Sequence, residues 1–190
     1  MRSKLVLAAL ITLLTLPACA QVAPAVKIGG LPLGIGGGFS DYSLDFGPGR
    51  RMTGASVWAD YNLFHGLGVE GEATWIFASK PSVLTRMEQD TYKGGLIYKT
   101  RPFFGIRPFA KGLVGVGSID FASRNPFYTH DTRTIYTAGG GVEYKVWKTL
   151  YARGEYEYQF WPEIFGPNTL NPNGFSIGAT YYLRGVHRHY

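Results

Sequence analysis

The sequence predicts an all-β fold, an eight-stranded antiparallel up-and-down transmembrane β-barrel. Three observations support this prediction: the composition, an alternation of polar and apolar residues along the strands, and an alternation of long and short connections between them. Aromatic residues make up 15% of the chain, charged residues make up 17%, and there are 26 glycines. Soluble domains carry about 25% charged residues. In a barrel wall alternate residues meet lipid and lumen, so a chain of nearly neutral mean hydropathy can build a membrane-spanning wall.

Eight segments have strand-like sequences, and the connections between them alternate in length. The first connection, "SDYSLDFGPGRRM", is long, the second, "FHG", is short, and the rhythm continues to the long "WPEIFGPNTLNPN". A membrane barrel with short periplasmic turns and long outer loops has this rhythm. We therefore expect the connections near Ser82, Phe127 and Asn168 outside the cell, and His65 and Lys148 in the periplasm. The predicted strands are Leu33–Tyr42, Thr53–Leu63, Leu67–Phe77, Asp90–Lys99, Ile106–Phe121, Arg133–Val146, Leu150–Phe160 and Gly174–Leu183.

The stretch "YARGEYEYQF", Tyr151 to Phe160, shows the alternation of residue types most clearly. Arg153, Glu155 and Glu157 share one face of a strand, and glycine and tyrosine residues share the other. Aromatic residues gather toward the ends of the predicted strands, which is typical of the interfacial girdles of a lipid-facing wall. The charges are therefore predicted to face the lumen and the tyrosines to face lipid.

The fifth predicted strand, "IRPFAKGLVGVGSIDF", is less regular than the others. Arg107 and Lys111 share a parity with Phe109 and Leu113, so charged and large apolar side chains fall on one face. Its glycines indicate close packing or strong bending.

The N-terminus, "MRSKLVLAALITLLTLPACAQ", has the layout of a secretory signal peptide, with Arg2 and Lys4 before an apolar run. The run is shorter than the roughly 20 residues of a transmembrane helix. Cleavage after Ala20 is favoured over lipidation of Cys19, because Pro17 then ends the apolar run where a cleavage region begins. The predicted organisation is a signal peptide at 1–20, a short leader at 21–32 and the barrel at 33–190.

These patterns resemble the small outer-membrane β-barrel family, of the OmpA membrane-domain and OmpX kind. The segment "GATYYL" is similar to that family's C-terminal assembly signal, with Gly178, Tyr181 and Leu183 in the three defining places. Leu183 stands where phenylalanine is usual, and the chain continues to Tyr190, so either the signal is internal or Tyr190 is the terminal aromatic. The resemblance implies an integral outer-membrane location. It does not imply one function, because such barrels serve as structural proteins, adhesins, pores and enzymes.

Charged residues on the predicted inner faces form the candidate site. An eight-stranded barrel is just wide enough for side chains to fill its interior, where charges have to be paired or hydrated. We therefore expect a structural salt-bridge plug, with a narrow gated polar path as the alternative. Candidate partners of Arg153 are Glu143, Glu155 and, across the barrel, Glu70 or Glu72. The whole predicted network is Glu70, Glu72, Lys93, Lys111, Glu143, Arg153, Glu155 and Glu157.

Three other motifs give weaker signals. Lipid A deacylases of this barrel type use a histidine and a serine; His130-Asp131-Thr132, expected in a long outer loop, offers threonine instead of serine, so a solvated loop histidine is favoured. His187 and His189 could chelate a metal but lack a third ligand. "GIGGG", Gly34 to Gly38, lacks the Lys-Ser/Thr of a phosphate loop and is expected to be a flexible strand. We expect no catalytic residue, no cofactor and no metal.

The sequence favours a non-enzymatic outer-membrane barrel with a structural or surface-interaction role. A small pore is the alternative, and an enzyme that modifies lipid A is a weaker one. Expected partners are outer-membrane lipid, lipopolysaccharide and the barrel-assembly machinery, with the chain itself a monomer. The 19 basic residues less Arg2 and Lys4 leave 17 against 13 acidic residues, a mature charge of +4, which does not favour nucleic acid as a partner. The basic residues in or beside the outer loops could either meet lipopolysaccharide phosphates or remain solvated; they are Arg50, Arg51, Lys80, Arg86, Arg124 and Arg133.

Overall fold

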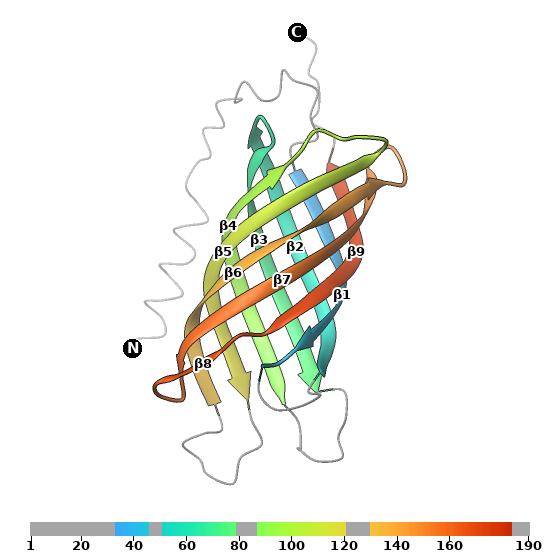
Figure 1. Ribbon diagram of the computed structural model, residues 1–190. Coiled ribbons are helices and arrows are strands. Elements are labelled where there is room, and N and C mark those ends of the chain that lie inside the picture. The colour runs from blue at the N-terminus through green and yellow to red at the C-terminus, as the bar shows by residue number, and fades with distance from the viewer. Residues whose placement is uncertain (1–32, 46–50, 79–86, 121–129, 184–190) are drawn as a thin grey trace, which may run out of the picture.

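Eight long strands close into an antiparallel barrel, and a ninth, short strand lies at one end of it (Figure 1). The computed structural model describes residues 33–45, 51–78, 87–120 and 130–183. The predicted signal peptide, the leader and the tail from Arg184 to Tyr190 lie outside these residues. The strands are β1 (Leu33–Ser43), β2 (Arg51–Phe64), β3 (Leu67–Ala78), β4 (Glu88–Lys99), β5 (Ile106–Asp120), β6 (His130–Lys145), β7 (Leu150–Ile164), β8 (Asn168–Leu170) and β9 (Asn173–Leu183).

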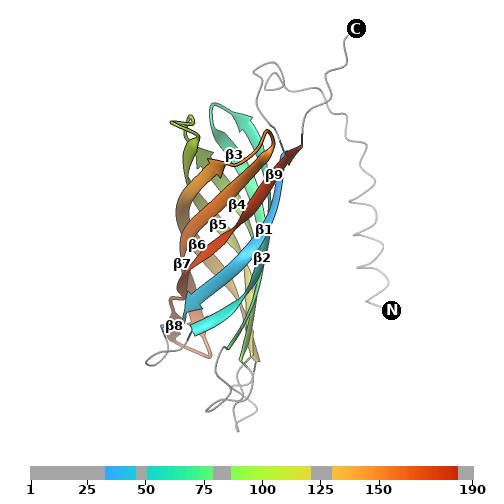
Figure 2. The same cartoon turned by 90° about the vertical axis from the view of Figure 1, so that its right-hand side faces the viewer.

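The first and last long strands close the barrel. β1 pairs with β2 on one side and with β9 on the other, from Leu33 opposite Leu183 to Ser43 opposite Asn173. The remaining neighbours follow chain order, and β7 pairs with both β6 and β9. All these pairings are antiparallel and the strands tilt together around the barrel (Figure 2). The predicted eight-stranded barrel is therefore confirmed. Within the described part of the chain, no helix is long and apolar enough to cross a membrane.

The strands extend further toward the long connections than the sequence indicated. β7 continues to Ile164, and β8 pairs with its last residues. β6 begins at His130 rather than Arg133, because its pairing with β5 continues to Asp120 opposite His130. The prediction that His130-Asp131-Thr132 lies in a loop is therefore wrong, since these residues belong to a strand.

Two of the short connections are tight turns in the left-handed region. His65 and Gly66 have φ angles of 49° and 88°, and Phe104 and Gly105 have φ angles of 49° and 81°. Positive φ at both central residues is the mark of a type I′ turn, whose twist matches that of the flanking strands. The short connections therefore join neighbouring strands with little chain beyond the barrel.

The outward residues form an apolar wall. Along β7 the exposed side chains include Tyr156, Tyr158 and Phe160, while Arg153, Glu155 and Glu157 are buried inside. The same division holds along β3, β4, β6 and β9. A soluble barrel would show the opposite arrangement, so the exposed aromatic and aliphatic side chains identify a lipid-facing surface.

Inward-facing glycines make room for large side chains at the closing seam. A Cβ on Gly36 would lie 2.3 Å from Nε1 of the Trp58 ring. The indole instead crosses the inner face of β1 and donates to Thr180 Oγ1 on β9, at 2.9 Å. The "GIGGG" segment is thus a paired strand whose glycines allow β2 and β9 to bond across β1, which corrects its interpretation as merely flexible.

Candidate functional site in the barrel lumen

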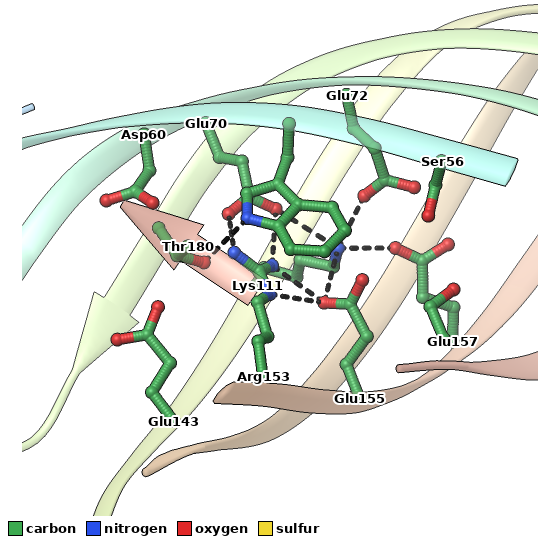
Figure 3. A network of polar contacts seen from close by, with 12 residues as sticks. Ser56, Asp60, Glu70, Glu72, Lys111, Glu143, Arg153, Glu155, Glu157 and Thr180 are labelled. Atoms are coloured by element: carbon green, nitrogen blue, oxygen red, sulfur yellow. Dashed lines mark hydrogen bonds and ion pairs between the residues drawn. The ribbon is translucent and has the colours of Figure 1, made fainter. Parts of the chain in front are cut away.

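The middle of the lumen is filled by a cluster of buried, mutually paired charges, which we call the central cluster (Figure 3). It is centred on Lys111, which reaches inward from β5. Lys111 Nζ lies 2.5 Å from Glu72 Oε2 and 2.5 Å from Glu157 Oε1, and Glu70 and Glu155 are also within ion-pair distance. The members of the central cluster are Glu70, Glu72, Lys93, Lys111, Arg153, Glu155 and Glu157.

Arg153 connects opposite sides of the barrel. Its Nη1 and Nη2 donate to the two oxygens of Glu70 at 2.8 and 2.9 Å, and its Nε and Nη2 donate to Glu155 Oε2. Its guanidinium carbon lies 4.4 Å from the ring centre of Phe109 and 4.8 Å from that of Trp58. A planar guanidinium can bind carboxylates with its edges while its faces contact aromatic rings. The irregular fifth strand is explained here, because Phe109 contributes that ring beside the inward lysine.

Glu143 does not pair with Arg153, although the two stand opposite each other on β6 and β7. Of the candidate partners, Arg153 binds Glu70 and Glu155 and does not bind Glu143. Glu143 instead accepts hydrogen bonds from Lys99 Nζ at 3.0 Å, from Arg107 and from the Tyr182 hydroxyl. Glu143 and Arg153 are thus neighbours in register that bind different partners.

These contacts form a second group at the short-turn end of the lumen, the rim cluster, which consists of Asp60, Lys99, Arg107, Glu143 and Tyr182. Lys99 Nζ also contacts Asp60 Oδ1 at 2.7 Å and the Tyr182 hydroxyl at 2.5 Å. Asp60, Lys99 and Arg107 were not among the predicted site residues. Asp60 stands opposite the inward Glu70, and Lys99 has the same parity as Lys93 on β4. These two relations could have identified Asp60 and Lys99 from the sequence.

The long-connection end of the lumen is apolar, which the sequence did not predict. Trp161 is completely buried there, and its Nε1 donates to Gln159 at 3.0 Å. The ring lies against Gly117, where a Cβ would meet it at 2.3 Å. We call this group the apolar plug; it consists of Tyr42, Leu44, Met52, Ile76, Met87, Ile119, Ile135, Trp161, Ile164 and Leu170. From the long-connection end to the short-turn end, the lumen therefore holds an apolar layer, the central cluster and the rim cluster.

Glu72, Glu155 and Glu157 have the spacing of a metal-binding set, with one oxygen from each lying within 4.8 Å of the others. Lys111 Nζ contacts all three carboxylates at 2.5 to 2.9 Å. The lysine ammonium therefore takes the position that a cation would occupy. His187 and His189, the other metal candidates, lie outside the described residues.

A separate group of polar side chains lies on the outer wall at the long-connection end. Asp120 Oδ1 is 2.5 Å from His130 Nδ1, and His130 Nε2 is 3.2 Å from Thr132 Oγ1. The Thr132 hydroxyl is in turn 3.3 Å from Ser118 Oγ. The pairing of β5 with β6 brings these four residues together. The sequence singled out His130 and Thr132. Asp120 and Ser118 could not be found in the same way, because the register of β5 against β6 places them beside these residues.

The predicted assembly-signal residues all lie on β9. Tyr181 and Leu183 are exposed on the lipid-facing side, whereas Gly178 points inward, where a Cβ would lie 2.2 Å from the Gly37 carbonyl oxygen. Of the loop cations, Arg51 binds Asp41 and Arg133 binds Asp131. Arg50, Lys80, Arg86 and Arg124 lie outside the described residues.

Comparison with known proteins agrees with this geometry. Residues 6–182 match the model of the family described as outer membrane protein beta-barrel domain. The chain belongs to this family. It is thus an integral β-barrel protein of the outer membrane, as the charged lumen and apolar wall also indicate. No curated protein matches the chain significantly.

Solved outer-membrane barrels share the fold at low sequence identity. Neisserial surface protein A has a TM-score of 0.62 and 13% identity, with 80% of this chain and 96% of that chain covered. Ail, the attachment invasion locus protein of Yersinia pestis, has a TM-score of 0.58 and 16% identity, with coverages of 80% and 99%. OprG from Pseudomonas aeruginosa has a TM-score of 0.51 and 16% identity, with coverages of 80% and 96%. These likenesses concern the fold alone.

Proposed function

We propose that the protein is a non-conducting, non-enzymatic outer-membrane barrel whose role is structural or lies in surface interaction. The observation that carries this proposal is the filled lumen. Charged side chains in the central and rim clusters pair with one another, and the apolar plug follows them toward the long connections. A solute would have to displace paired charges and then Trp161, each of which is costly.

The experiment is a conductance measurement on refolded protein in planar bilayers. We expect no discrete current steps with the wild-type chain. Replacing Trp161 with alanine removes the largest side chain of the apolar plug, and adding Arg153→Ala opens the charged layer. Steps that appear only in the double variant support a filled lumen. Steps in the wild type would favour the pore and contradict the proposal.

The same proposal includes the partners expected of such a barrel. Lipid surrounds the apolar wall, lipopolysaccharide surrounds the outer rim, and the assembly machinery recognises β9, with the chain acting as a monomer. The exposed apolar side chains of the wall support the lipid contact. Cross-linking in cells from positions on β9, compared with positions on β4, tests recognition by the assembly machinery.

A second candidate function, hydrolysis of lipid esters, is favoured by one observation. Asp120, His130 and Thr132 form a chain of acid, imidazole and hydroxyl on the outer wall. In such a chain the imidazole accepts the hydroxyl proton as the oxygen attacks a carbonyl carbon, and the acid orients the imidazole. The acyl group would pass to Thr132, the alcohol would leave with the proton, and water would then release the fatty acid.

Release of fatty acid from lipids in reconstituted vesicles, measured by mass spectrometry, tests this candidate. We expect Thr132→Val and His130→Asn to abolish any release. Thr134→Val is the matched control, because Thr134 lies next on the same outward face of β6. Release that survives Thr132→Val, or that never occurs, excludes this candidate and leaves the non-enzymatic proposal.

A further inference from the structure

Exposed cations and exposed aromatic rings lie together at the short-turn end of the barrel. The connection between β4 and β5 carries Arg101, Phe103 and Phe104, and the two phenylalanine side chains are 72% and 86% exposed. The connection between β6 and β7 carries Trp147, which is 69% exposed, and the exposed Lys148. Rings so exposed would meet bulk water in a soluble protein.

The two connections form one surface. The backbone N–H of Lys145 donates to the Gly105 carbonyl at 3.0 Å, which joins the end of β6 to the turn that precedes β5. Trp147 N donates to Leu150 O, which holds the second turn against β7. We call this surface the basic rim; its members are Arg101, Phe103, Phe104, Lys145, Trp147 and Lys148.

Asp and Glu are absent from the basic rim, since all 13 acidic residues of the chain belong to its described part and lie elsewhere in it. Six of them are buried in the lumen: Asp60, Glu70, Glu72, Glu143, Glu155 and Glu157. The other seven lie at the long-connection end: Asp41, Asp45, Glu88, Asp90, Asp120, Asp131 and Glu163. The exposed cations of the basic rim therefore have no Asp or Glu side chain on the same surface, in contrast to Arg51 and Arg133 at the other end.

The position of Phe104 is informative. It occupies the first central residue of a type I′ turn, at φ 49°, where asparagine, aspartate or glycine is preferred. A bulky residue is uncommon in this region, so local turn formation does not account for the phenylalanine. Its ring packs edge-to-face on Phe103, with centroids 4.4 Å apart, and both residues belong to the connection between the end of β4 and the start of β5.

We propose that the basic rim binds the headgroups of anionic phospholipids in the leaflet that adjoins the short turns. The surface continues the lipid-facing wall directly, so lipid is its neighbour by position. Aromatic rings favour the level of the headgroups, and lysine and arginine near a membrane surface attract anionic lipids. The guanidinium of Arg101 can bind a phosphate through two N–H groups. The barrel would thus hold anionic phospholipid beside the two connections that form the basic rim.

The test is the lipid selectivity of the full barrel reconstituted in phosphatidylcholine bilayers. Spin-labelled phosphatidylglycerol and phosphatidylcholine are added separately, and the motionally restricted fraction of each gives its relative association with the protein. We expect a preference for phosphatidylglycerol that falls by at least half in the triple variant Arg101→Gln, Lys145→Gln, Lys148→Gln. High salt should reduce the wild-type preference toward that of the variant.

The matched control is Lys80→Gln, Arg86→Gln, Arg124→Gln, which removes the same charge from the connections between β3 and β4 and between β5 and β6. We expect it to retain most of the preference. An equal loss in both variants, or no preference in the wild type, overturns the proposal. The variant Phe104→Ser adds a separate check. If it changes the oligomeric state and leaves lipid selectivity unaltered, the rim is an interface between copies and the proposal is wrong.

Discussion

At the scale of single residues, Arg153 and Gly117 illustrate how the lumen is filled. Arg153 is 1% exposed, binds two carboxylates from opposite sides of the barrel and contacts two aromatic rings. Gly117 has no side chain, and this leaves space for the Trp161 ring. The stability of the barrel should therefore be sensitive to loss of the charge at Arg153 and to added side-chain volume at Gly117.

Replacement of Arg153 with methionine should strongly destabilise the barrel. Removing one partner of a buried ion pair costs about 3–5 kcal/mol, because the remaining carboxylates are left without their donor. Adding Glu70→Gln should restore part of the loss. The measurement is a double-mutant cycle on urea unfolding in lipid vesicles, with Arg51→Met as a control at an exposed ion pair. An Arg153→Met barrel as stable as the wild type would contradict the buried ion pairs described for the central cluster.

Replacement of Gly117 with alanine should destabilise the apolar plug by overpacking, by about 1–3 kcal/mol. The added Cβ would lie 2.3 Å from the ring of Trp161, which is completely buried and packed in the apolar plug. Gly112→Ala, on the outward face of the same strand with nothing within 4 Å of its Cβ, should be nearly neutral. Equal effects on the free energy of unfolding would show that Trp161 does not pack as described.

At the scale of the strand, alternate residues of each long strand face the lumen and the lipid. In β7 the inward side carries Arg153, Glu155 and Glu157 and the outward side carries apolar residues. Gly154 lies outward between Val142 on β6 and Ile177 on β9, away from both ends of the wall. A Cβ at Gly154 meets no atom within 4 Å, so a substitution there probes the surrounding medium without a steric clash.

Replacement of Gly154 with arginine should reduce the stability of the barrel in lipid by about 2–4 kcal/mol, the cost of a cation near the middle of a bilayer. Gly154→Leu adds an apolar side chain without a charge, and it should be tolerated. Folding into lipid vesicles, followed by urea titration, measures both variants. Equal tolerance of arginine and leucine would mean that this face of β7 does not contact hydrocarbon.

At the scale of the whole molecule, the two ends of the barrel differ in chemistry. The short-turn end has the basic rim and the rim cluster, while the long-connection end has the apolar plug and all the acidic residues outside the lumen. The asymmetry suits a protein inserted in one direction only. We expect the short turns in the periplasm, since long loops of such barrels face outward.

Single-cysteine labelling of intact cells checks this orientation. In a chain with Cys19→Ser, cysteine at Asn168 should react with a membrane-impermeant maleimide, and cysteine at Lys148 should react only after the outer membrane is opened. The opposite pattern would invert the orientation and would place the basic rim in the outer leaflet.

The sequence by itself determined the strands, their two faces and the barrel. Residue alternation and connection length are local properties, so they can be read without knowing which strands are paired. It also placed the charges of the central cluster inside, since parity alone assigns a face. Tertiary structure decided which charges meet: Glu143 turned to Lys99 and Arg107, and Arg153 to Glu70, because partners across a lumen depend on strand tilt and register. The apolar plug likewise required structure, because its residues come from separate strands and become a layer only when the barrel closes.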